Sequence, residues 1–245
     1  MMKSLNIALI GYGKMGKTIE NLALAKSHNI VLKTSSSNPL STNQDLLSNV
    51  DVAIEFTGPD VAADNLEILA NHGINTVCGS TAWLDDYDRI CNRFKEKKAA
   101  FLYASNFSIG VNIFFSVNNH LAKLMNKLEE YEVKMTEAHH IQKKDAPSGT
   151  AVSLVEQITA QLDRKSSWQM QSGDETMGNS QIPIKAIREA DIKGMHKVEY
   201  ISKIDQISIM HEAFSREGFA SGALLAAEWL YGKQGIFNMN DVLDI

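Results

Sequence analysis

The sequence predicts an α/β protein with an N-terminal Rossmann-like parallel sheet domain and a mixed-sheet α+β domain after it. Through residues 5–104, short apolar runs alternate with helical patterns, which is typical of a parallel sheet with helical crossovers. The glycine-rich turn of residues 11–16, GYGKMG, directly follows the first of these runs. Further along, strand-like runs follow one another with no helix between them, which indicates an antiparallel or mixed sheet.

The first domain is predicted to begin with a strand and then to alternate helices and strands. Apolar periodicity gives the type of each element, and glycine or proline marks several of their ends. The predicted strands are residues 5–10, 30–35, 50–56, 75–78 and 99–104. The predicted helices between them are residues 14–26, 61–72 and 84–98. In the second helix we expect one buried face, formed by Ala62, Leu66, Leu69 and Ala70.

The second part of the chain is predicted to contain two long helices, at residues 110–127 and 148–162, and several strands. Tyr131, Val133 and Met135 alternate with charged residues, which is the pattern of a half-buried strand. The other strand-like runs are residues 182–188, 196–202 and 205–211. The polar residues 166–179 are expected to form a mobile loop, and residues 221–231 a closing helix.

Composition bounds the class of protein. The chain has 245 residues, 44% of them hydrophobic, which is enough for one large core or two modest ones. Its formal net charge of −5 argues against non-specific nucleic-acid binding. We find no signal-peptide pattern and no apolar run long enough to span a bilayer. Cys78 and Cys91 lack metal-ligand spacing, Cys78 is expected to be buried, and a reducing cytoplasm is the expected location.

The glycine-rich turn is interpreted as a dinucleotide-binding loop, because it follows a strand and begins a helix. Glycines let the backbone approach a pyrophosphate, and the unpaired N–H groups of a helix N-terminus face it. The predicted cofactor contacts in this turn are Gly11, Gly13, Lys14, Met15 and Gly16. The alternative is an ordinary glycine turn.

The residues after the second strand leave the choice of cofactor open. The acidic residue that commonly binds the ribose is not obvious there, and serines occupy positions 35–37. Hydroxyl groups tolerate a 2′-phosphate better than a carboxylate does, and Lys14 or Lys33 can supply positive charge. We therefore expect NADPH at least to be accepted, and the alternative is a plain serine-rich loop.

Two further turns follow apolar strands of the first domain. Ligands bind outside the carboxyl ends of parallel strands, so both turns are expected to face the cofactor. The predicted contacts are Gly79, Ser80 and Thr81 in one turn and Ala104, Ser105, Asn106 and Phe107 in the other. Read alone, each is only a polar turn.

Residues 137–151, EAHHIQKKDAPSGTA, hold the strongest group of candidate catalytic residues. His139 and His140 are adjacent and would face opposite sides of a strand, and Lys143 and Lys144 follow them. A histidine can donate a proton near neutral pH, and a lysine can donate one or pair with a carboxylate. No third ligand has convincing spacing, so we expect no metal site.

The turn formed by Ser148, Gly149 and Thr150 stands directly before a helical run. Its hydroxyls and the first N–H groups of the helix would make a binding site for a carboxylate. The simpler alternative is a serine or threonine N-cap that needs no ligand. Taken with the glycine-rich turn, the segment favours an enzyme that delivers hydride to an anionic substrate and supplies the proton locally.

These motifs resemble the 4-hydroxy-tetrahydrodipicolinate reductase family, long called dihydrodipicolinate reductase. The likeness rests on residues 137–151 and extends to residues 55–59, 106–112, 232–233 and 241–243. It implies reduction of a cyclic dicarboxylate by NADH or NADPH in the diaminopimelate and lysine pathway. It also implies a homotetramer with three parts. These are residues 1–105 for dinucleotide binding, 106–214 for substrate binding and tetramerisation, and a segment at 215–245 that returns to the first domain.

The resemblance also assigns roles by position in the motifs. His139 is the proton donor and acceptor, and Lys143 is the second proton donor. The turns that begin at Gly79 and Ala104 line the nicotinamide. The residues assigned to substrate binding are His140, Ser148, Gly149, Thr150 and Arg216.

The chain departs from the family pattern in three places. Its glycine loop is one residue shorter than the commoner form, Ser37 or a neighbour stands at the acidic ribose position, and residues 79–82 read GSTA instead of GTTG. None of these changes removes a catalytic group. Two alternatives stay open: a related semialdehyde or homoserine dehydrogenase, the former needing a nucleophilic cysteine, and a nucleotide-sensing regulatory protein that would not need His139 or Lys143.

Overall fold

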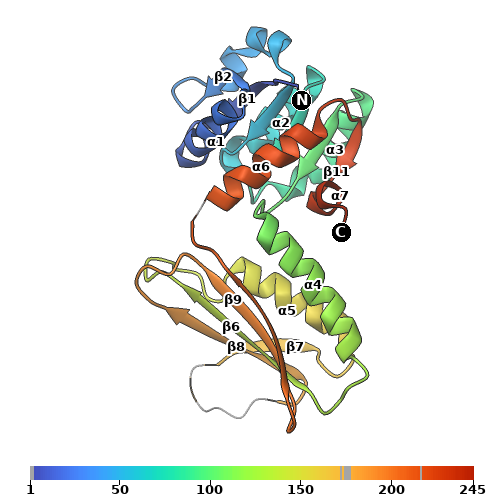
Figure 1. The fold of residues 1–245 in the computed structure, drawn as a ribbon. Helices are drawn as coiled ribbons and strands as arrows, with labels where there is room; N and C mark the ends of the chain where they lie inside the picture. The colour runs from blue at the N-terminus through green and yellow to red at the C-terminus, as the bar shows by residue number, and fades with distance from the viewer. Residues whose placement is uncertain (1–2, 172, 174–177, 216) are drawn as a thin grey trace. The chain divides into compact units, whose positions relative to one another are not determined.

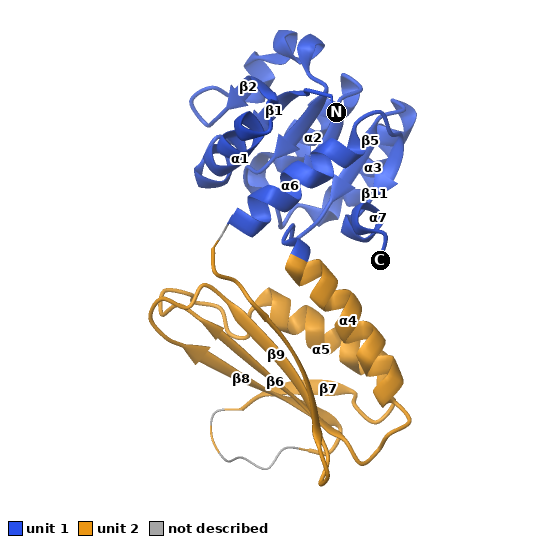
Figure 2. Ribbon diagram, in the orientation of Figure 1, with its two compact units in different colours: residues 1–109, 217–245 blue, residues 110–216 orange. Residues whose placement is uncertain are grey.

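The chain folds into two compact units in the computed structural model, which describes residues 3–171, 173, 178–215 and 217–245 (Figures 1 and 2). Unit 1 is formed by Met1–Ile109 together with Glu217–Ile245. Unit 2 is the continuous segment Gly110–Arg216. Unit 1 is therefore built from both ends of the chain, and each unit has its own hydrophobic core.

Unit 1 is built on a parallel sheet, which confirms the predicted Rossmann-like architecture. Its strands are β1 (Asn6–Ile10), β2 (Asn29–Thr34), β3 (Val52–Glu55), β4 (Asn75–Cys78), β5 (Ala100–Tyr103) and β11 (Gly235–Phe237). They lie in the order β11-β5-β4-β3-β1-β2, and every neighbouring pair is parallel. The strand order reverses at β1, which leaves a crevice at the carboxyl ends of β1 and β3.

Helices cover both faces of this sheet (Figure 1). The α-helices of unit 1 are α1 (Lys14–Ala25), α2 (Pro59–Asn71), α3 (Tyr87–Glu96), α6 (Glu217–Leu230) and α7 (Met239–Leu243). The short 3-10 helices are η1 (Leu40–Thr42), η2 (Gln44–Asn49) and η3 (Leu84–Asp86). Helices α1 and α6 pack together on one face, and α2 and α3 pack together on the other. The expected face of α2 is buried, with Ala62, Leu66, Leu69 and Ala70 all inside.

Several elements of unit 1 differ from the sequence prediction. The helix predicted over residues 84–98 is divided into η3 and the shorter α3, and α6 begins four residues earlier than the predicted start at 221. Strand β11 and helix α7 were not predicted. Both are very short, so their apolar periodicity carries little signal, and packing against β5 and α6 decides their structure.

Unit 2 contains a five-stranded mixed sheet, as predicted for the second domain. Its strands are β6 (Glu132–His139), β7 (Ser167–Met170), β8 (Gln181–Arg188), β9 (Met195–Ile201) and β10 (Gln206–Glu212). The order is β10-β9-β6-β8-β7, with antiparallel pairs on the β9 side of β6 and parallel pairs on the β8 side. Helices α4 (Ile109–Met125) and α5 (Gly149–Gln161) pack on the core of this sheet.

One prediction for unit 2 was wrong. Residues 166–179 were expected to form a loop, but residues 167–170 form β7, which pairs in parallel with β8. Trp168 and Met170 face the core, and this two-residue apolar alternation is too short to stand out in a polar segment. The prediction also covers residues 172 and 174–177, which lie outside the described part of the chain.

Candidate functional site

The glycine-rich turn lies where the strand order of unit 1 reverses, between β1 and α1. Gly11 has a φ of +96°, and a Cβ there would lie 2.1 Å from the carbonyl oxygen of Phe56. A Cβ on Gly16 would lie 2.6 Å from the carbonyl oxygen of Gly11. Only glycine fits these two positions. Gly13, by contrast, has no described atom within 4 Å of such a Cβ, so the turn presents open backbone there.

This open side faces a cavity of about 320 Å³. Gly13 is the N-cap of α1, and no described side chain caps the helix, so its first N–H groups remain available for an anion. The residues that line the cavity are Gly11, Gly13, Lys14, Met15, Phe56, Thr57, Gly58, Pro59, Gly79, Ser80 and Thr81. The turns predicted from β1 and β4 therefore come together, and the turn after β3 joins them.

The buried carboxyl group of Glu55 stabilises the turns that line this cavity. Glu55 is fully buried at the end of β3, and its Oε1 accepts a hydrogen bond from the N–H of Thr57 at 3.0 Å. The same N–H of Thr57 lies 2.8 Å from the hydroxyl oxygen of Ser80. Burial raises the pKa of Glu55, and hydrogen bonds from Thr57, Ser80 and Cys78 only partly offset this. These bonds fix the two turns that line the cavity.

The position of Cys78 bears on the alternative that the protein is a semialdehyde dehydrogenase with a nucleophilic cysteine. As predicted, it is buried, and its thiol donates to Oε2 of Glu55 at 3.1 Å. Burial and the nearby Glu55 raise the pKa of the Cys78 thiol well above its usual range. A thiol held in this way is a poor nucleophile, which argues against a semialdehyde dehydrogenase that uses Cys78.

Some predicted cofactor residues lie elsewhere in unit 1. Ser37 is exposed in the turn after β2, with its hydroxyl oxygen 3.0 Å from that of Ser35. Lys33 is paired with Glu20 at 3.0 Å. The ring of Phe107 is buried in the core, 5.7 Å from the ring of Phe56. The described lining of the cavity includes neither Gly16 nor any residue of the segment 104–107.

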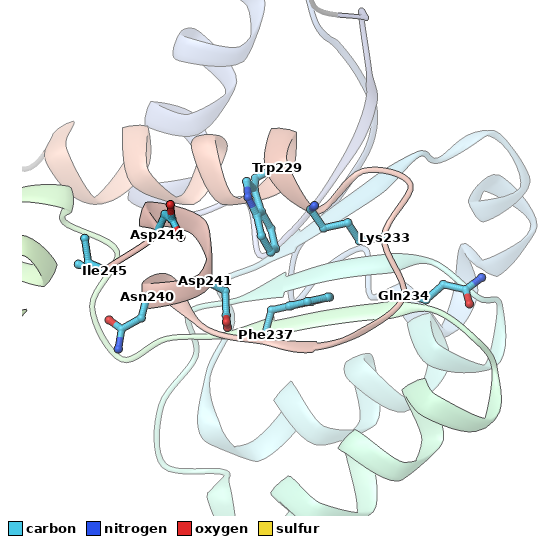
Figure 3. Close-up of a pocket in the computed structure, with 8 residues that line it drawn as sticks. All are labelled: Trp229, Lys233, Gln234, Phe237, Asn240, Asp241, Asp244 and Ile245. Carbon is cyan, nitrogen blue, oxygen red and sulfur yellow. The ribbon is translucent and has the colours of Figure 1, made fainter.

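A larger hollow of about 580 Å³ lies in the C-terminal part of unit 1 (Figure 3). Trp229 meets Phe237 edge to face, and the ammonium group of Lys233 lies 4.1 Å from the centre of a Trp229 ring. The other residues that line it are Gln234, Asn240, Asp241, Asp244 and Ile245. None of the residues predicted to bind cofactor or substrate lies in this hollow.

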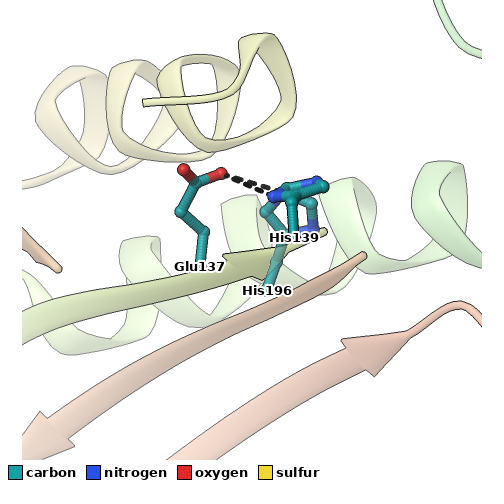
Figure 4. A group of neighbouring side chains, drawn as sticks. All are labelled: Glu137, His139 and His196. Atoms are coloured by element: carbon teal, nitrogen blue, oxygen red, sulfur yellow. Dashed lines mark ion pairs between the residues drawn. The ribbon is translucent and has the colours of Figure 1, made fainter. Parts of the chain in front are cut away.

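The candidate catalytic residues of unit 2 cluster at the carboxyl end of β6 (Figure 4). Glu137 and His139 share one face of the strand, and Nδ1 of His139 lies 3.2 Å from Oε2 of Glu137. Only 10% of the His139 side chain and 0% of the Glu137 side chain are exposed. The neighbouring strand β9 places His196 opposite Glu137, and the rings of His139 and His196 meet edge to face at 5.1 Å.

Arg188 of β8 supplies positive charge to the same cluster. Register places Arg188 beside His139, and its Nη2 donates to Oε1 of Glu137 at 2.8 Å. Burial alone would raise the pKa of Glu137, but the hydrogen bonds from its neighbours outweigh burial and lower that pKa to about 2. Glu137 is therefore an anion at neutral pH.

The pKa of His196 is lowered as well, but for this residue the lowered pKa favours the neutral form. Burial disfavours its protonated form, and the charge of His139 acts in the same direction. Together they lower the pKa of His196 from 6.5 to about 4, although the carboxylate of Glu137 opposes them. His196 is therefore neutral at physiological pH.

Lys143 lies in the loop after β6. Its Nζ donates to both carboxylate oxygens of Asp145, at 2.8 and 2.9 Å, and this hydrogen bond lowers the pKa of Asp145. The carbonyl oxygen of Asp145 accepts from Arg188 at 2.6 Å. One guanidinium group therefore contacts both the carboxylate beside His139 and the loop that carries Lys143.

The turn before α5 shows the simpler of its two predicted roles at Ser148. Its hydroxyl oxygen accepts from the N–H of Ala151 at 3.2 Å, which is an N-cap bond, and lies 3.0 Å from Nε2 of His196. Gly149 is exposed and Thr150 is half-buried at the start of the helix. Carboxylate binding by these two residues stays a prediction.

The other predicted substrate residues have separate surroundings. His140 follows the end of β6 and lines a hollow of about 420 Å³ in unit 2, together with Ile141, Gln142, Ala190, Asp191, Lys193, Phe214 and Ser215. The surroundings of the adjacent His139 and His140 thus differ, but β6 ends at His139, so the expected alternation along a strand does not apply to His140. Arg216 lies outside the described residues.

The cluster also contains three groups of the kind that bind metal ions. Donor atoms of Glu137, His139 and His196 lie within 4.8 Å of one another. Existing contacts account for this arrangement, because Glu137 accepts from Arg188 and from the N–H of Ser148, at 2.8 and 3.2 Å. The sequence prediction of no metal site stays a prediction.

Fold and site together define a class of protein, a nicotinamide-dependent oxidoreductase with a Rossmann-like unit and a second unit that carries acid–base groups. Comparison with known families specifies it further. Residues 5–107 match the family model described as dihydrodipicolinate reductase, N-terminus, and residues 110–243 match dihydrodipicolinate reductase, C-terminus. The chain belongs to the dihydrodipicolinate reductase family, and it is an enzyme that uses NADH or NADPH.

Individual relatives agree with this assignment. The chain is 48% identical over 240 residues to a 4-hydroxy-tetrahydrodipicolinate reductase of Christiangramia forsetii, with 98% of both chains covered. It is 34% identical to the reductase of that name from Rickettsia bellii, covering 97% of this chain and 94% of that one. A solved dipicolinate-bound dihydrodipicolinate reductase from Paenisporosarcina sp. TG-14 shares the fold, with a TM-score of 0.75, 19% identity and coverage of 96% and 98%.

Proposed function

We propose that this protein reduces 4-hydroxy-tetrahydrodipicolinate to tetrahydrodipicolinate, with NADH or NADPH as the hydride source, in diaminopimelate and lysine biosynthesis. The observation that carries this proposal is the family match across both units, combined with a relative 48% identical over 98% of the chain. The glycine-turn cavity of unit 1 and the histidine cluster of unit 2 supply the two chemical functions that this reaction needs.

Unit 1 is proposed to be the dinucleotide-binding domain. The N–H groups at the start of α1 and the open backbone at Gly13 suit a pyrophosphate, and Lys14 adds positive charge to the same cavity. The turn at residues 79–81 lines the cavity, and together with residues 104–107 it would contact the nicotinamide. Ser37 would lie at the ribose. The reduced nicotinamide, when bound, supplies the hydride.

Unit 2 is proposed to bind the substrate and to supply the proton. His139 and Lys143 would exchange protons with the substrate, because one is an imidazole oriented by a carboxylate and the other a cation on the adjoining loop. The residues that would hold the two substrate carboxylates are His140, Ser148, Gly149, Thr150 and Arg216. The helix N-terminus at Gly149, which is exposed at the start of α5, gives this assignment its physical basis.

The proposed roles can be tested with substrate made in situ from pyruvate and aspartate semialdehyde, following oxidation of NADPH and of NADH. We expect fast oxidation by the wild type and a loss of kcat of about 100-fold or more in His139→Gln and Lys143→Ala, since general acid–base groups contribute that much. Lys144→Ala is the matched control for charge, because Lys144 is exposed beside Lys143, and it should retain kcat.

Three outcomes would contradict these proposals. Tight cofactor binding by the wild type without any oxidation would remove the reductase function and favour a nucleotide sensor. A strong preference for NADH would remove the expectation that NADPH is accepted. Equal losses in the Lys143 and Lys144 variants would mean that only net charge matters there.

We also propose a homotetramer located in the cytoplasm, with unit 2 carrying the subunit contacts. The sheet face opposite α4 and α5 supports this proposal, because no described element of unit 2 covers it. An ion-pair group lies on this face, in which Glu199 contacts Lys197 at 2.8 Å and Lys134 at 3.8 Å.

No helix in the described residues has the length and apolar character to cross a bilayer. Sedimentation equilibrium tests the tetramer, and a monomer at micromolar concentration would contradict it.

A further inference from the structure

The carboxylate of Glu137 forms a close ion-pair contact with the imidazole of His139. Because the two residues are separated by one position on β6, their side chains project from the same face of the strand. The carboxylate lies 3.2 Å from Nδ1, which leaves Nε2 as the ring nitrogen that can meet a ligand. Gly194 lies beside Nε2, and a Cβ at that position would lie only 3.3 Å from it, which is a tight contact. The glycine therefore keeps a side chain from crowding Nε2.

A guanidinium group holds Glu137 in turn. Nη2 of Arg188 donates to Oε1 of Glu137 at 2.8 Å, while Nη1 donates to the carbonyl oxygen of Ile187 at the same distance. The same Nη2 donates to the carbonyl oxygen of Asp145 at 2.6 Å. Because Asp145 also accepts from Nζ of Lys143, Arg188 connects the support of His139 to the loop of Lys143. A lysine could not reproduce this, since it lacks the rigid fork of donors.

We propose that Glu137 and Arg188 are positioning residues for the reaction. Glu137 fixes the ring of His139 through Nδ1, and Arg188 fixes Glu137 and the loop that carries Lys143. This inference rests on the proposed reductase function. Neither residue is a proton donor to the substrate. Each acts through a neighbour, as the carboxylate partners of reactive or ligating histidines do in other proteins.

The chain offers a matched control for this proposal. In unit 1, Glu228 forms another buried pair with a histidine, because its Oε1 lies 2.9 Å from Nε2 of His28. The exposed fractions of these two side chains are 6% and 3%, similar to those of Glu137 and His139. Glu228→Gln therefore removes a buried carboxylate–imidazole pair that the proposed chemistry does not use.

Steady-state kinetics of Glu137→Gln, Glu137→Asp, Arg188→Lys and Glu228→Gln give the first test. We expect Glu137→Gln to lower kcat about 10- to 100-fold with little change in either KM, as for other partners that orient a reactive histidine. Glu137→Asp keeps the charge and should recover part of that loss. The kcat of Arg188→Lys should lie between those of Glu137→Gln and Glu137→Asp. Glu228→Gln should keep the wild-type kcat.

Nuclear magnetic resonance of isotope-labelled histidine gives a second test, which needs no turnover. The imidazole nitrogen signals of His139, identified by their loss in His139→Gln, should report a proton on Nδ1 in the wild type. In Glu137→Ala this preference should disappear, whereas in Glu228→Gln it should persist. A role confined to stability would leave these signals unchanged in a folded variant.

The outcomes separate this inference from the proposed function. Wild-type kcat in Glu137→Gln, or unchanged nitrogen signals in Glu137→Ala, would overturn the positioning role while the reductase function stands. Absence of turnover by the wild type would overturn the function, and the nitrogen signals would still decide whether Glu137 fixes the ring. If Glu137→Gln fails to fold, Glu137→Asp and Arg188→Lys carry the same comparison.

Discussion

His196 makes the stability of unit 2 depend on pH. Its pKa is lowered from 6.5 to about 4 because burial and the charge of His139 disfavour the protonated ring. Between these two values the unfolded chain binds a proton that the folded chain does not. The stability contributed by neutral His196 is thus present above pH 6.5 and is lost as the pH falls towards 4, up to about 3 kcal/mol.

The measurement is urea unfolding of wild type and His196→Gln at neutral pH and near pH 4.5. We expect the free energy of unfolding of the wild type to fall more steeply, because Gln keeps a donor for Ser148 but has no group to protonate. Glu137 should contribute little over this range, because its pKa falls from 4.5 to about 2 on folding and its contribution is therefore lost only below about pH 4.5. Equal losses in both proteins would contradict the assignment to His196.

The sequence reveals only part of this residue network. Glu137 and His139 can be placed on one strand face by their spacing, and the segment that holds them is distinctive. His196 and Arg188 carry no local signal, because each lies in an ordinary strand far along the chain. Only the register of β6 with β9 and β8 brings them to Glu137 and His139, and register depends on the packed sheet.

At the level of elements, helix α6 depends on a glycine for its position in unit 1. A Cβ on Gly222 would lie 1.8 Å from the carbonyl oxygen of Phe107. Backbone cannot move away as a flexible side chain can, so Gly222→Ala should displace α6. We expect Gly222→Ala to cost about 2 kcal/mol or more, because overpacking outweighs the gain of about 1 kcal/mol in helix propensity.

A second glycine in the same helix provides the control. A Cβ on Gly218 would lie 3.7 Å from the hydroxyl of Ser108, which is ordinary contact. Gly218→Ala should therefore be neutral or slightly stabilising. The measurement is the free energy of unfolding of both variants in urea. Equal effects of the two substitutions would contradict the idea that the close approach of Phe107 requires glycine at position 222.

Long, periodic elements were predictable, and short ones were not. The buried face of α2 follows directly from its sequence, as does the alternation in β6. Strands β7 and β11 each contain four residues or fewer, and partners elsewhere in the chain determine them. Their local sequences are equally compatible with a strand and with a loop.

For the whole molecule, the C-terminal segment completes unit 1. Strand β11 pairs with β5, and Phe237 and Met239 pack on the core that also holds β1 and β3. A chain that ends at Gln234 would lose these contacts and expose the edge of β5. We expect such a chain to unfold at lower temperature and to bind NADPH weakly, because the cavity proposed for the cofactor lies in the same unit.

Thermal unfolding and fluorescence titration with NADPH test this expectation. A chain that lacks only residues 244 and 245 is the control, since it keeps β11 and α7. Wild-type cofactor affinity in the longer truncation would contradict a structural role for the returning segment. Sequence periodicity gave no sign of this return, and only the resemblance to the reductase family indicated it.

The interrupted layout of unit 1 has a consequence for how the protein is made. A ribosome releases the chain from its N-terminus, so all of unit 2 is synthesised before α6 and β11 exist. Unit 2 can close its core as soon as its own segment has emerged. The first five strands of unit 1 cannot complete their core until α6 and β11 have been synthesised, and the surface that α6 later covers stays exposed during that time. In a growing cell, this exposed surface is the part of the nascent chain where a chaperone would be needed most.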